Sequence, residues 1–365
     1  MSNFPSTVTL SSPPHNGTAK PHHRVPHFAA IPNEAISFLT PYSGLLLTLW
    51  LIILYAIKRY FLEMFLFPRC YKQLYKSMED SVRRGFLVHH ISAGTKVVLL
   101  IVGAKPFSDV VFGKSSLHDR YSKYTARPTM GDMLLVLTQL FVALYLFELM
   151  IRKSPSPIAV SHHVGAVVIA QAAVALSLQL DKEANATMEY VLCLVWAAFD
   201  VLAELWLNVA FILYRIYPKN YALMAYVFGS TGIISIMGTV AETVMVMTLF
   251  GQSWDQWDMS FKVVTPILHV LFTIAQIHAA RILFHFWMKY KKLLAEEERD
   301  LMDPEGRMPK QKDGTKAGTI LTEEPILGES SSTTPREASL DVSQNEKPKK
   351  LSVVGHINKF FTGRS

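Results

Sequence analysis

The amino-acid sequence predicts an all-α protein, a polytopic bundle of about seven transmembrane helices. Half of the residues are hydrophobic (50%) and 18% are charged, which is a lower charged fraction than a soluble domain usually has. The apolar residues fall into long runs, each of a length that crosses a bilayer as a helix. Lysine and arginine gather between alternate runs, as they do in the cytoplasmic loops of membrane proteins.

The apolar runs divide the chain into three parts. Residues 1–36 are rich in Ser, Pro, Thr and His, which predicts a disordered N-terminus. Residues 37–292 form the predicted bundle, with helices over residues 37–60, 85–104, 131–151, 158–178, 188–214, 221–250 and 261–288. Residues 293–365 are charged and then rich in Ser, Thr, Gly and Pro, which predicts a disordered tail. The basic end of this tail fits a surface-bound amphipathic helix and a solvated segment equally well.

The distribution of cations predicts the orientation of the spans. The segment between the first two spans is strongly basic and is therefore expected in the cytosol; its cations are Lys58, Arg59, Arg69, Lys72, Lys76, Arg83 and Arg84. With seven spans, the N-terminus then lies in the lumen and the C-terminus in the cytosol. The glycosylation sequons at Asn16 and Asn185 fall on the lumenal side. The basic loop from residue 105 to 127 is the exception to this pattern.

A histidine pair stands out in the fourth predicted span. Pro155 and Pro157 are expected to end the third helix and begin the fourth. His162 and His163 follow about one turn into a run that is otherwise apolar. Imidazoles inside a membrane are rare and usually face a bundle interior or a wet cavity. We expect this pair to serve function more than stability.

Helix rise places further polar residues at a similar depth, in the cytosolic third of the bundle. On the fifth span, Asp200, Glu204 and Asn208 are spaced by four and share one face. The predicted site comprises His162, His163, Asp200, Glu204, Asn208, Glu148, His89, Lys96, Arg281 and His278. His269 and Gln276, by contrast, are expected to make ordinary interhelical hydrogen bonds.

Lys96 lies near the middle of the second span, at the depth of the two carboxylates of the fifth span. A lone charge at this depth costs at least about 2.5 kcal/mol, and pairing offsets much of that cost. We therefore expect Lys96 to contact Glu204 or Asp200 directly. The adjacent histidines lack the i, i+4 spacing of metal motifs, and there is no phosphate loop or nucleophile elbow. The sequence therefore predicts no metal site and no bound cofactor.

These features resemble the TLC-domain family of membrane proteins. The segment SPSPIAVSHHVG is similar to the histidine pair that follows a polar turn in that family, and FDVLAELWLNVAFILYRIYP is similar to its later acidic helix. The resemblance covers roughly residues 80 to 290. Two departures separate the chain from typical ceramide synthases, since Ala166 stands where family members often carry Thr, and only Glu148 represents their acidic signature. A divergent member of the family is indicated.

The resemblance implies an endoplasmic reticulum protein that handles a lipid or acyl chain in lipid homeostasis, with membrane lipids as partners and no nucleic acid. An alternative is a ceramide-synthase-like acyltransferase of sphingolipid metabolism, with acyl-CoA as co-substrate. A neutral imidazole of the pair would then act as base, and Asp200 or Glu204 would orient it. A seven-span receptor or transporter is the third alternative. It is disfavoured because Cys70 and Cys193 do not suggest a receptor disulfide and no inverted repeat is visible.

Overall fold

The computed structural model describes residues 31, 33–153, 155–180 and 185–302. Within them, seven helical segments are long and apolar enough to cross a membrane, so the all-α fold is confirmed and the chain is a multi-pass membrane protein. The predictions of disorder over residues 1–30 and 303–365 lie outside the described residues, as do the sequon at Asn16 and the amphipathic end of the tail.

The spans follow one another in chain order. The first comprises η2 (Thr40–Tyr42), α1 (Ser43–Ala56), the π-helical η3 (Ile57–Leu66) and α2 (Phe67–Cys70), and the short α3 (Lys72–Ser77) follows it. The other spans are α4 (Asp80–Val111), α5 (Met130–Ile151), α6 (Pro157–Leu176), α7 (Ala186–Ile216), α8 (Tyr221–Gln252) and α9 (Met259–Met302), with the short η4 (Trp254–Gln256) before the last.

Several predicted helix boundaries are wrong, and the largest differences are at the ends of the first and last spans. The first helical span was expected to end at residue 60, but it continues to Cys70, so that the cations Lys58, Arg59 and Arg69 lie on a helix. The last span was expected to end at residue 288, but α9 continues to Met302. Hydropathy marks where a helix leaves the bilayer, whereas Lys, Arg and Glu are good helix formers that let it continue beyond.

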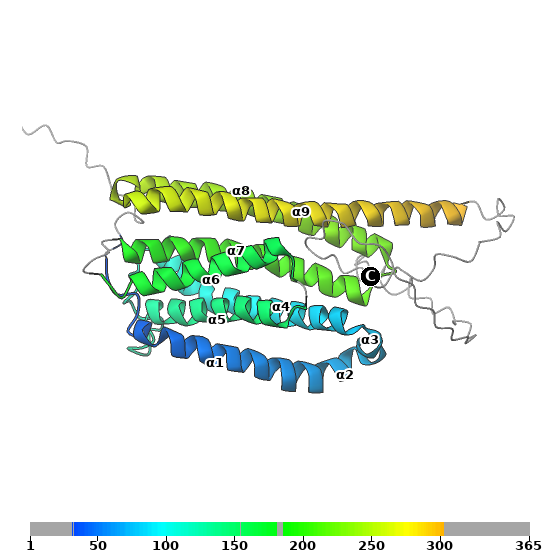
Figure 1. Cartoon of the computed structure of the whole chain (residues 1–365), viewed down its shortest axis with the longest axis horizontal. Helices are drawn as coiled ribbons and strands as arrows, with labels where there is room; N and C mark the ends of the chain where they lie inside the picture. Colours follow the sequence, from blue (N-terminus) through cyan, green and yellow to red (C-terminus); the bar gives the residue numbers. More distant parts are fainter. Residues whose placement is uncertain (1–30, 32, 154, 181–184, 303–365) are drawn as a thin grey trace, which may run out of the picture. The chain divides into compact units, whose positions relative to one another are not determined.

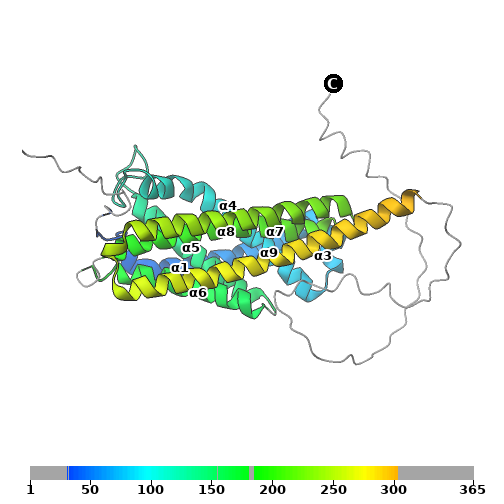
Figure 2. The same ribbon diagram turned by 90° about the horizontal axis from the view of Figure 1, so that it is seen from above.

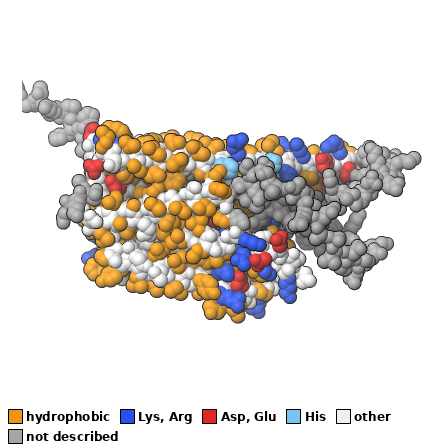
Figure 3. Space-filling model, in the orientation of Figure 1, with side chains coloured by type: hydrophobic (Ala, Val, Ile, Leu, Met, Phe, Trp, Pro, Cys, Tyr) orange, Lys and Arg blue, Asp and Glu red, His pale blue; other side chains and the backbone are white. Residues whose placement is uncertain are grey.

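The described helices lie side by side along a common direction (Figures 1 and 2). α8 and α9 pack along each other, α4 packs on α5 and α7, and α1 packs on α5. In the most apolar stretch of α5, 72% of the residues are buried, against 11% in that of the first span, so α5 is the inner helix and the first span is peripheral. Figure 3 shows hydrophobic side chains over the middle of the bundle, with lysines and arginines near the end where α2 and α3 lie.

The start of α5 is fixed by side-chain caps and by a close approach of the backbone. Thr129 and Asp132 form a capping box, and the Ser37 hydroxyl donates to Asp132 Oδ1 at 2.6 Å. The Gly131 amide donates to the Leu117 carbonyl at 2.7 Å. A Cβ atom at Gly131 would lie 1.8 Å from the Ile36 carbonyl oxygen, so this close approach of three chain segments requires glycine.

The turn before the histidine pair has the predicted form. α5 ends at Ile151 and α6 begins at Pro157, whose missing amide hydrogen suits the first helical position. The Ser156 hydroxyl accepts a hydrogen bond from the Ala159 amide at 3.1 Å and caps α6. This cap sets the register that places His162 and His163 opposite the end of α5.

Candidate functional site

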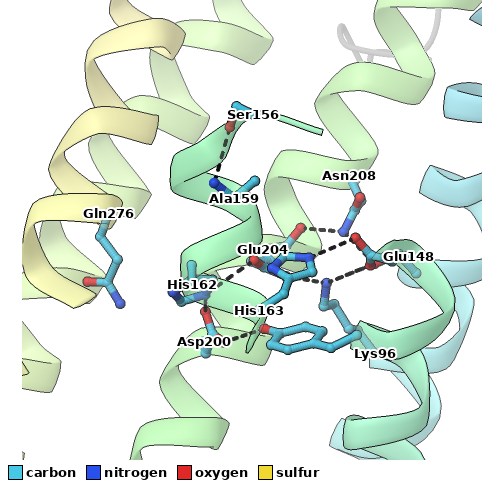
Figure 4. Close-up of polar contacts among 12 residues, drawn as sticks. Lys96, Glu148, Ser156, Ala159, His162, His163, Asp200, Glu204, Asn208 and Gln276 are labelled. Atoms are coloured by element: carbon cyan, nitrogen blue, oxygen red, sulfur yellow. Dashed lines mark hydrogen bonds and ion pairs between the residues drawn. The ribbon is translucent and has the colours of Figure 1, made fainter. Parts of the chain in front are cut away.

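A cluster of polar side chains lies inside the bundle where α4, α5, α6 and α7 meet (Figure 4). We call it the polar cluster; its members are Lys96, Tyr145, Glu148, Arg152, His162, His163, Asp200, Glu204 and Asn208. Seven of these residues were predicted as site residues from their depth along the helices, and the structure brings them together.

Lys96 is fully buried near the middle of α4. Its Nζ donates to Glu204 Oε2 at 2.5 Å and to the Ser92 hydroxyl at 2.8 Å, and Glu148 Oε1 lies 3.9 Å away. The predicted contact of Lys96 with one of the carboxylates of α7 is therefore confirmed, with Glu204 as the partner. Glu148, which lies on α5, forms a second ion pair with the same ammonium group.

Glu148 links three helices. Its Oε2 accepts from Arg152 Nη2 at 3.1 Å, directly after the end of α5, and from His163 Nε2 on α6 at 3.1 Å. The Glu148 side chain is 2% exposed, so the two cations that face it, Lys96 and Arg152, compensate a charge that water does not reach. Glu148 thereby ties the end of α5 to α4 and α6.

His162 and Asp200 form a second contact between α6 and α7. His162 Nε2 lies 3.2 Å from Asp200 Oδ1 and 3.7 Å from Glu204 Oε1. The Tyr145 hydroxyl donates to Asp200 Oδ2, and the Tyr145 ring stacks on His163 with centroids 4.3 Å apart. Asp200 therefore fixes the His162 ring from one side, which is the arrangement of a base and its orienting carboxylate.

Asn208 connects this cluster to the start of α4. Its Nδ2 donates to the Ser92 hydroxyl at 2.9 Å, and its Oδ1 accepts from His89 Nδ1 at 2.7 Å. His89 stacks on Phe211 and lies behind Asn208, so it positions that amide and does not line the pocket described below. His90 instead bonds to the Tyr71 hydroxyl and the Phe86 carbonyl, away from the cluster.

Two predicted site residues, Arg281 and His278, do not join the cluster. Arg281 is exposed and His278 does not line the pocket beside the polar cluster. The face of α9 that borders the pocket carries Gln276, Ala279 and Leu283. Depth along α9 was a correct guide for Arg281 and His278, but their direction around the helix axis turns them away.

A smaller set of polar contacts joins α7, α8 and α9. His269 accepts from Trp196 Nε1 at 3.2 Å and contacts the Thr243 hydroxyl at 3.1 Å, so its predicted role as an interhelical hydrogen bonder is confirmed. Gln276 Nε2 donates to the buried Glu242 at 2.6 Å, as also expected for a residue of this kind. Gln276 borders the polar cluster in addition, which the sequence did not indicate.

Two cavities border the polar cluster, and a third borders one of these two. A polar pocket of about 90 Å³ is bordered by Glu148, His162, His163, Asp200 and Glu204. An apolar pocket of about 200 Å³ lies between α4, α5 and α7 and is lined by residues such as Leu99, Leu134 and Ala198.

A third pocket, of about 40 Å³, shares lining residues with both of these pockets. It shares His162, Asp200 and Gln276 with the polar pocket. It shares Phe141, Ala170, Cys193 and Ala197 with the apolar pocket. The three cavities therefore adjoin one another in a series that leads from charged side chains to aliphatic ones.

The cluster also contains three side chains with the composition of a metal site. One nitrogen of His162, one nitrogen of His163 and one carboxylate oxygen of Glu204 lie within 4.8 Å of one another. The sequence predicted no metal site because the spacing rule concerns ligands on one helix, and Glu204 comes from another helix.

Three residues of this region, Tyr145, Ser92 and Arg152, were not predicted from the sequence. Tyr145 and Arg152 lie three residues before and four residues after Glu148, so they share its helix face. Ser92 lies between His89 and Lys96 at the same helical spacing. Their helical spacing from predicted site residues could have indicated that they belong to the site. Single hydroxyl groups and interfacial arginines are common in membrane helices, however, so this spacing alone does not distinguish a site residue.

The two histidines are expected to differ in their effect on stability. His163 is 6% exposed, stacks on Tyr145 and bonds Glu148, so His163→Ala opens a cavity and should lower the free energy of unfolding by about 2–4 kcal/mol. His162 borders two cavities, so His162→Ala should cost only about 1 kcal/mol. Thermal unfolding in detergent, followed by size-exclusion fluorescence, measures both variants. Equal destabilisation by the two would contradict this division.

Comparison with protein-family models, with curated proteins and with solved structures finds no match to this chain.

Proposed function

We propose that this multi-pass membrane protein binds a lipid or acyl chain and acts in membrane lipid homeostasis, as a divergent TLC-type protein. The observation that carries the proposal is the series of adjoining cavities from the polar cluster to the apolar pocket. Amphipathic ligands have a polar head and an aliphatic chain, and the two ends of this series match those two parts. The proposed membrane is that of the endoplasmic reticulum, with the N-terminus lumenal and the C-terminus cytosolic.

The apolar pocket has room for part of an acyl chain. A dry cavity of about 150 Å³ lined by aliphatic and aromatic side chains binds benzene, so about 200 Å³ accommodates roughly eight carbon atoms. Each buried methylene contributes about 0.8 kcal/mol. The wall consists mainly of aliphatic and aromatic side chains, with Thr138, Tyr190 and Cys193 as its polar atoms. Thr138 and Tyr190 bond each other at 3.0 Å, which leaves the pocket suited to an aliphatic chain.

A second candidate function is acyl transfer from acyl-CoA. The observation that favours it is the contact of His162 with Asp200, which Tyr145 holds from the other side. A neutral His162 would take a proton from an acceptor amine or hydroxyl, which then attacks the thioester carbonyl. The imidazolium would return the proton to the departing CoA thiolate. The polar pocket contains a second imidazole–carboxylate pair, His163 with Glu148, but that carboxylate also pairs with Arg152.

Filling the apolar pocket is expected to remove the bound lipid. Ala198→Phe places a phenyl ring among the pocket residues, and exclusion of even two methylenes weakens binding more than tenfold. Lipids extracted from the purified protein and quantified by mass spectrometry should therefore fall at least tenfold per chain. The matched control is Ile101→Phe, since Ile101 is 73% exposed on the neighbouring helix. Equal lipid content in both variants would contradict the proposal.

The same protein preparation separates the two functions. Purified protein is incubated with labelled acyl-CoA and a panel of sphingoid bases and lysolipids, with His162→Ala as the comparison. Turnover that disappears in His162→Ala supports the acyltransferase. Bound lipid in the wild type without turnover supports the lipid-binding protein.

A further inference from the structure

We propose that His162, His163 and Glu204 bind a divalent transition-metal ion of the zinc class. One potential ligand atom from each lies within 4.8 Å of the other two, and in Figure 4 the Glu204 carboxylate lies between the two imidazoles. Two imidazoles and one carboxylate are the protein ligands of many zinc sites that keep a position open for water or substrate. This proposal does not depend on the lipid-binding function.

The hydrogen bonds of the two imidazoles are those of metal-binding histidines. His162 Nε2 faces Asp200 at 3.2 Å and His163 Nε2 faces Glu148 at 3.1 Å. An ionised carboxylate only accepts hydrogen bonds, so in the neutral rings each Nε2 carries the hydrogen and each Nδ1 carries a lone pair. Histidines that bind metals usually donate their other ring N–H to a carboxylate in the same way.

Within the described part of the chain, both Nδ1 atoms lack a hydrogen-bond partner. They are buried, and no hydrogen-bond partner is found for either among the described residues. Protonation of the rings would turn each Nδ1 into a buried donor without an acceptor, which costs about 1–3 kcal/mol. A metal ion instead uses the ring lone pairs. The unpaired Nδ1 atoms are therefore a second, independent observation that these two rings bind a ligand.

The charges of the cluster leave room for a cation. Glu148, Asp200 and Glu204 carry three negative charges, and the cations that contact them in the described chain are Lys96 and Arg152. With neutral imidazoles, one negative charge is uncompensated inside the membrane. A divalent ion with one anionic oxygen ligand would offset it. That ligand would come from the polar pocket, as water-derived hydroxide or a carboxylate or phosphate oxygen of a lipid head.

Lys96 contacts one carboxylate oxygen of Glu204 and leaves the other available to a metal ion. Its Nζ contacts Oε2 at 2.5 Å, and Oε1 lies 3.7 Å from His162 Nε2, so the His162 ring must turn on binding for its Nδ1 to face Glu204. Carboxylate ligands of metals are commonly fixed by such a second hydrogen bond. Tetrahedral zinc ligands lie about 3.4 Å apart, so the three side chains need to approach by about 1 Å on binding. His162 and Glu204 border the polar pocket, which gives them space for this movement.

The test measures metal content directly. The full chain, purified through a tag without histidine, is dialysed against micromolar zinc sulfate and then against buffer, and zinc is quantified by mass spectrometry. The expected result is about one zinc per wild-type chain and at least a tenfold lower content in both His162→Ala/His163→Ala and Glu204→Gln. His278→Ala/His285→Ala removes two imidazoles outside the polar cluster and should keep the wild-type content.

Substoichiometric zinc in the wild type, or equal loss in the control, overturns the proposal. Glu204→Gln keeps the shape of the side chain, so its metal content remains informative if the double histidine variant does not fold. Cobalt provides the second readout, because a tetrahedral cobalt site with nitrogen and oxygen ligands gives visible absorption bands. Their absence in zinc-free wild-type protein supplied with cobalt would also contradict the site.

Discussion

Replacement of Lys96 by methionine is expected to lower the free energy of unfolding by about 3–5 kcal/mol, the range observed when one partner of a buried ion pair is removed. Methionine keeps the length of the side chain but leaves Glu204 without its 2.5 Å partner inside the membrane. Glu148 retains Arg152 at 3.1 Å, so the loss falls mainly on Glu204. Denaturation of the purified protein in mixed micelles measures the difference.

Lys105→Met is the matched control on the same helix. Lys105 pairs with Asp109 at 2.6 Å, but both side chains are exposed, and such pairs contribute at most about 1 kcal/mol. Lys96→Met/Glu204→Gln should recover part of the stability, because it removes the uncompensated carboxylate. If Lys96→Met is as stable as Lys105→Met, the contact of Lys96 with Glu204 does not stabilise the fold.

Gly131→Ala is expected to cost about 3 kcal/mol, at the upper end of the usual range for an overpacked site. The added methyl group would lie 1.8 Å from the Ile36 carbonyl oxygen and 3.1 Å from that of Leu117. Both obstacles are backbone atoms, so no rotation of a side chain relieves the clash. The residues around Ile36 must then move away from the start of α5, and this movement is expected to lengthen or break the Ser37–Asp132 hydrogen bond.

Gly94→Ala provides the comparison for Gly131→Ala. Nothing lies within 4 Å of a Cβ at Gly94, so alanine there should change stability by less than about 1 kcal/mol, in the direction of a better helix. The two variants are compared by thermal unfolding and by protease cleavage of the segment before α1. Equal stability of the two variants would show that the contact of Ile36 with Gly131 is not fixed in the membrane.

Depth was the part of the site that the sequence could predict. Lys96, Glu148, His162 and Glu204 belong to four different helices, and helix rise alone was enough to place them at one level. The cost of a lone ammonium in hydrocarbon then required a partner for Lys96, and Glu204 is that partner. This physical requirement holds for any packing of the helices, which explains why the prediction succeeded.

The direction in which each side chain projects from its helix axis could not be predicted in the same way. Arg281 has the right depth but lies on the exposed face of α9, because the rotation of α9 depends on its packing against α8. The proximity of Glu204 to both histidines likewise depends on how α6 packs against α7. The cavities depend on small residues from several helices, such as Gly103 and Ala170, and no pattern within one helix indicates them.

The pairing of Lys96 has a consequence for how the chain enters the membrane during its synthesis. Glu204 follows Lys96 by 108 residues, which corresponds to roughly 5–20 s of translation. α4 is therefore made long before its main partner exists. Glu148, on the next helix to emerge, lies 3.9 Å from the same ammonium group. The hairpin of α4 and α5 is thus the smallest nascent unit that can leave the insertion machinery with the Lys96 charge compensated.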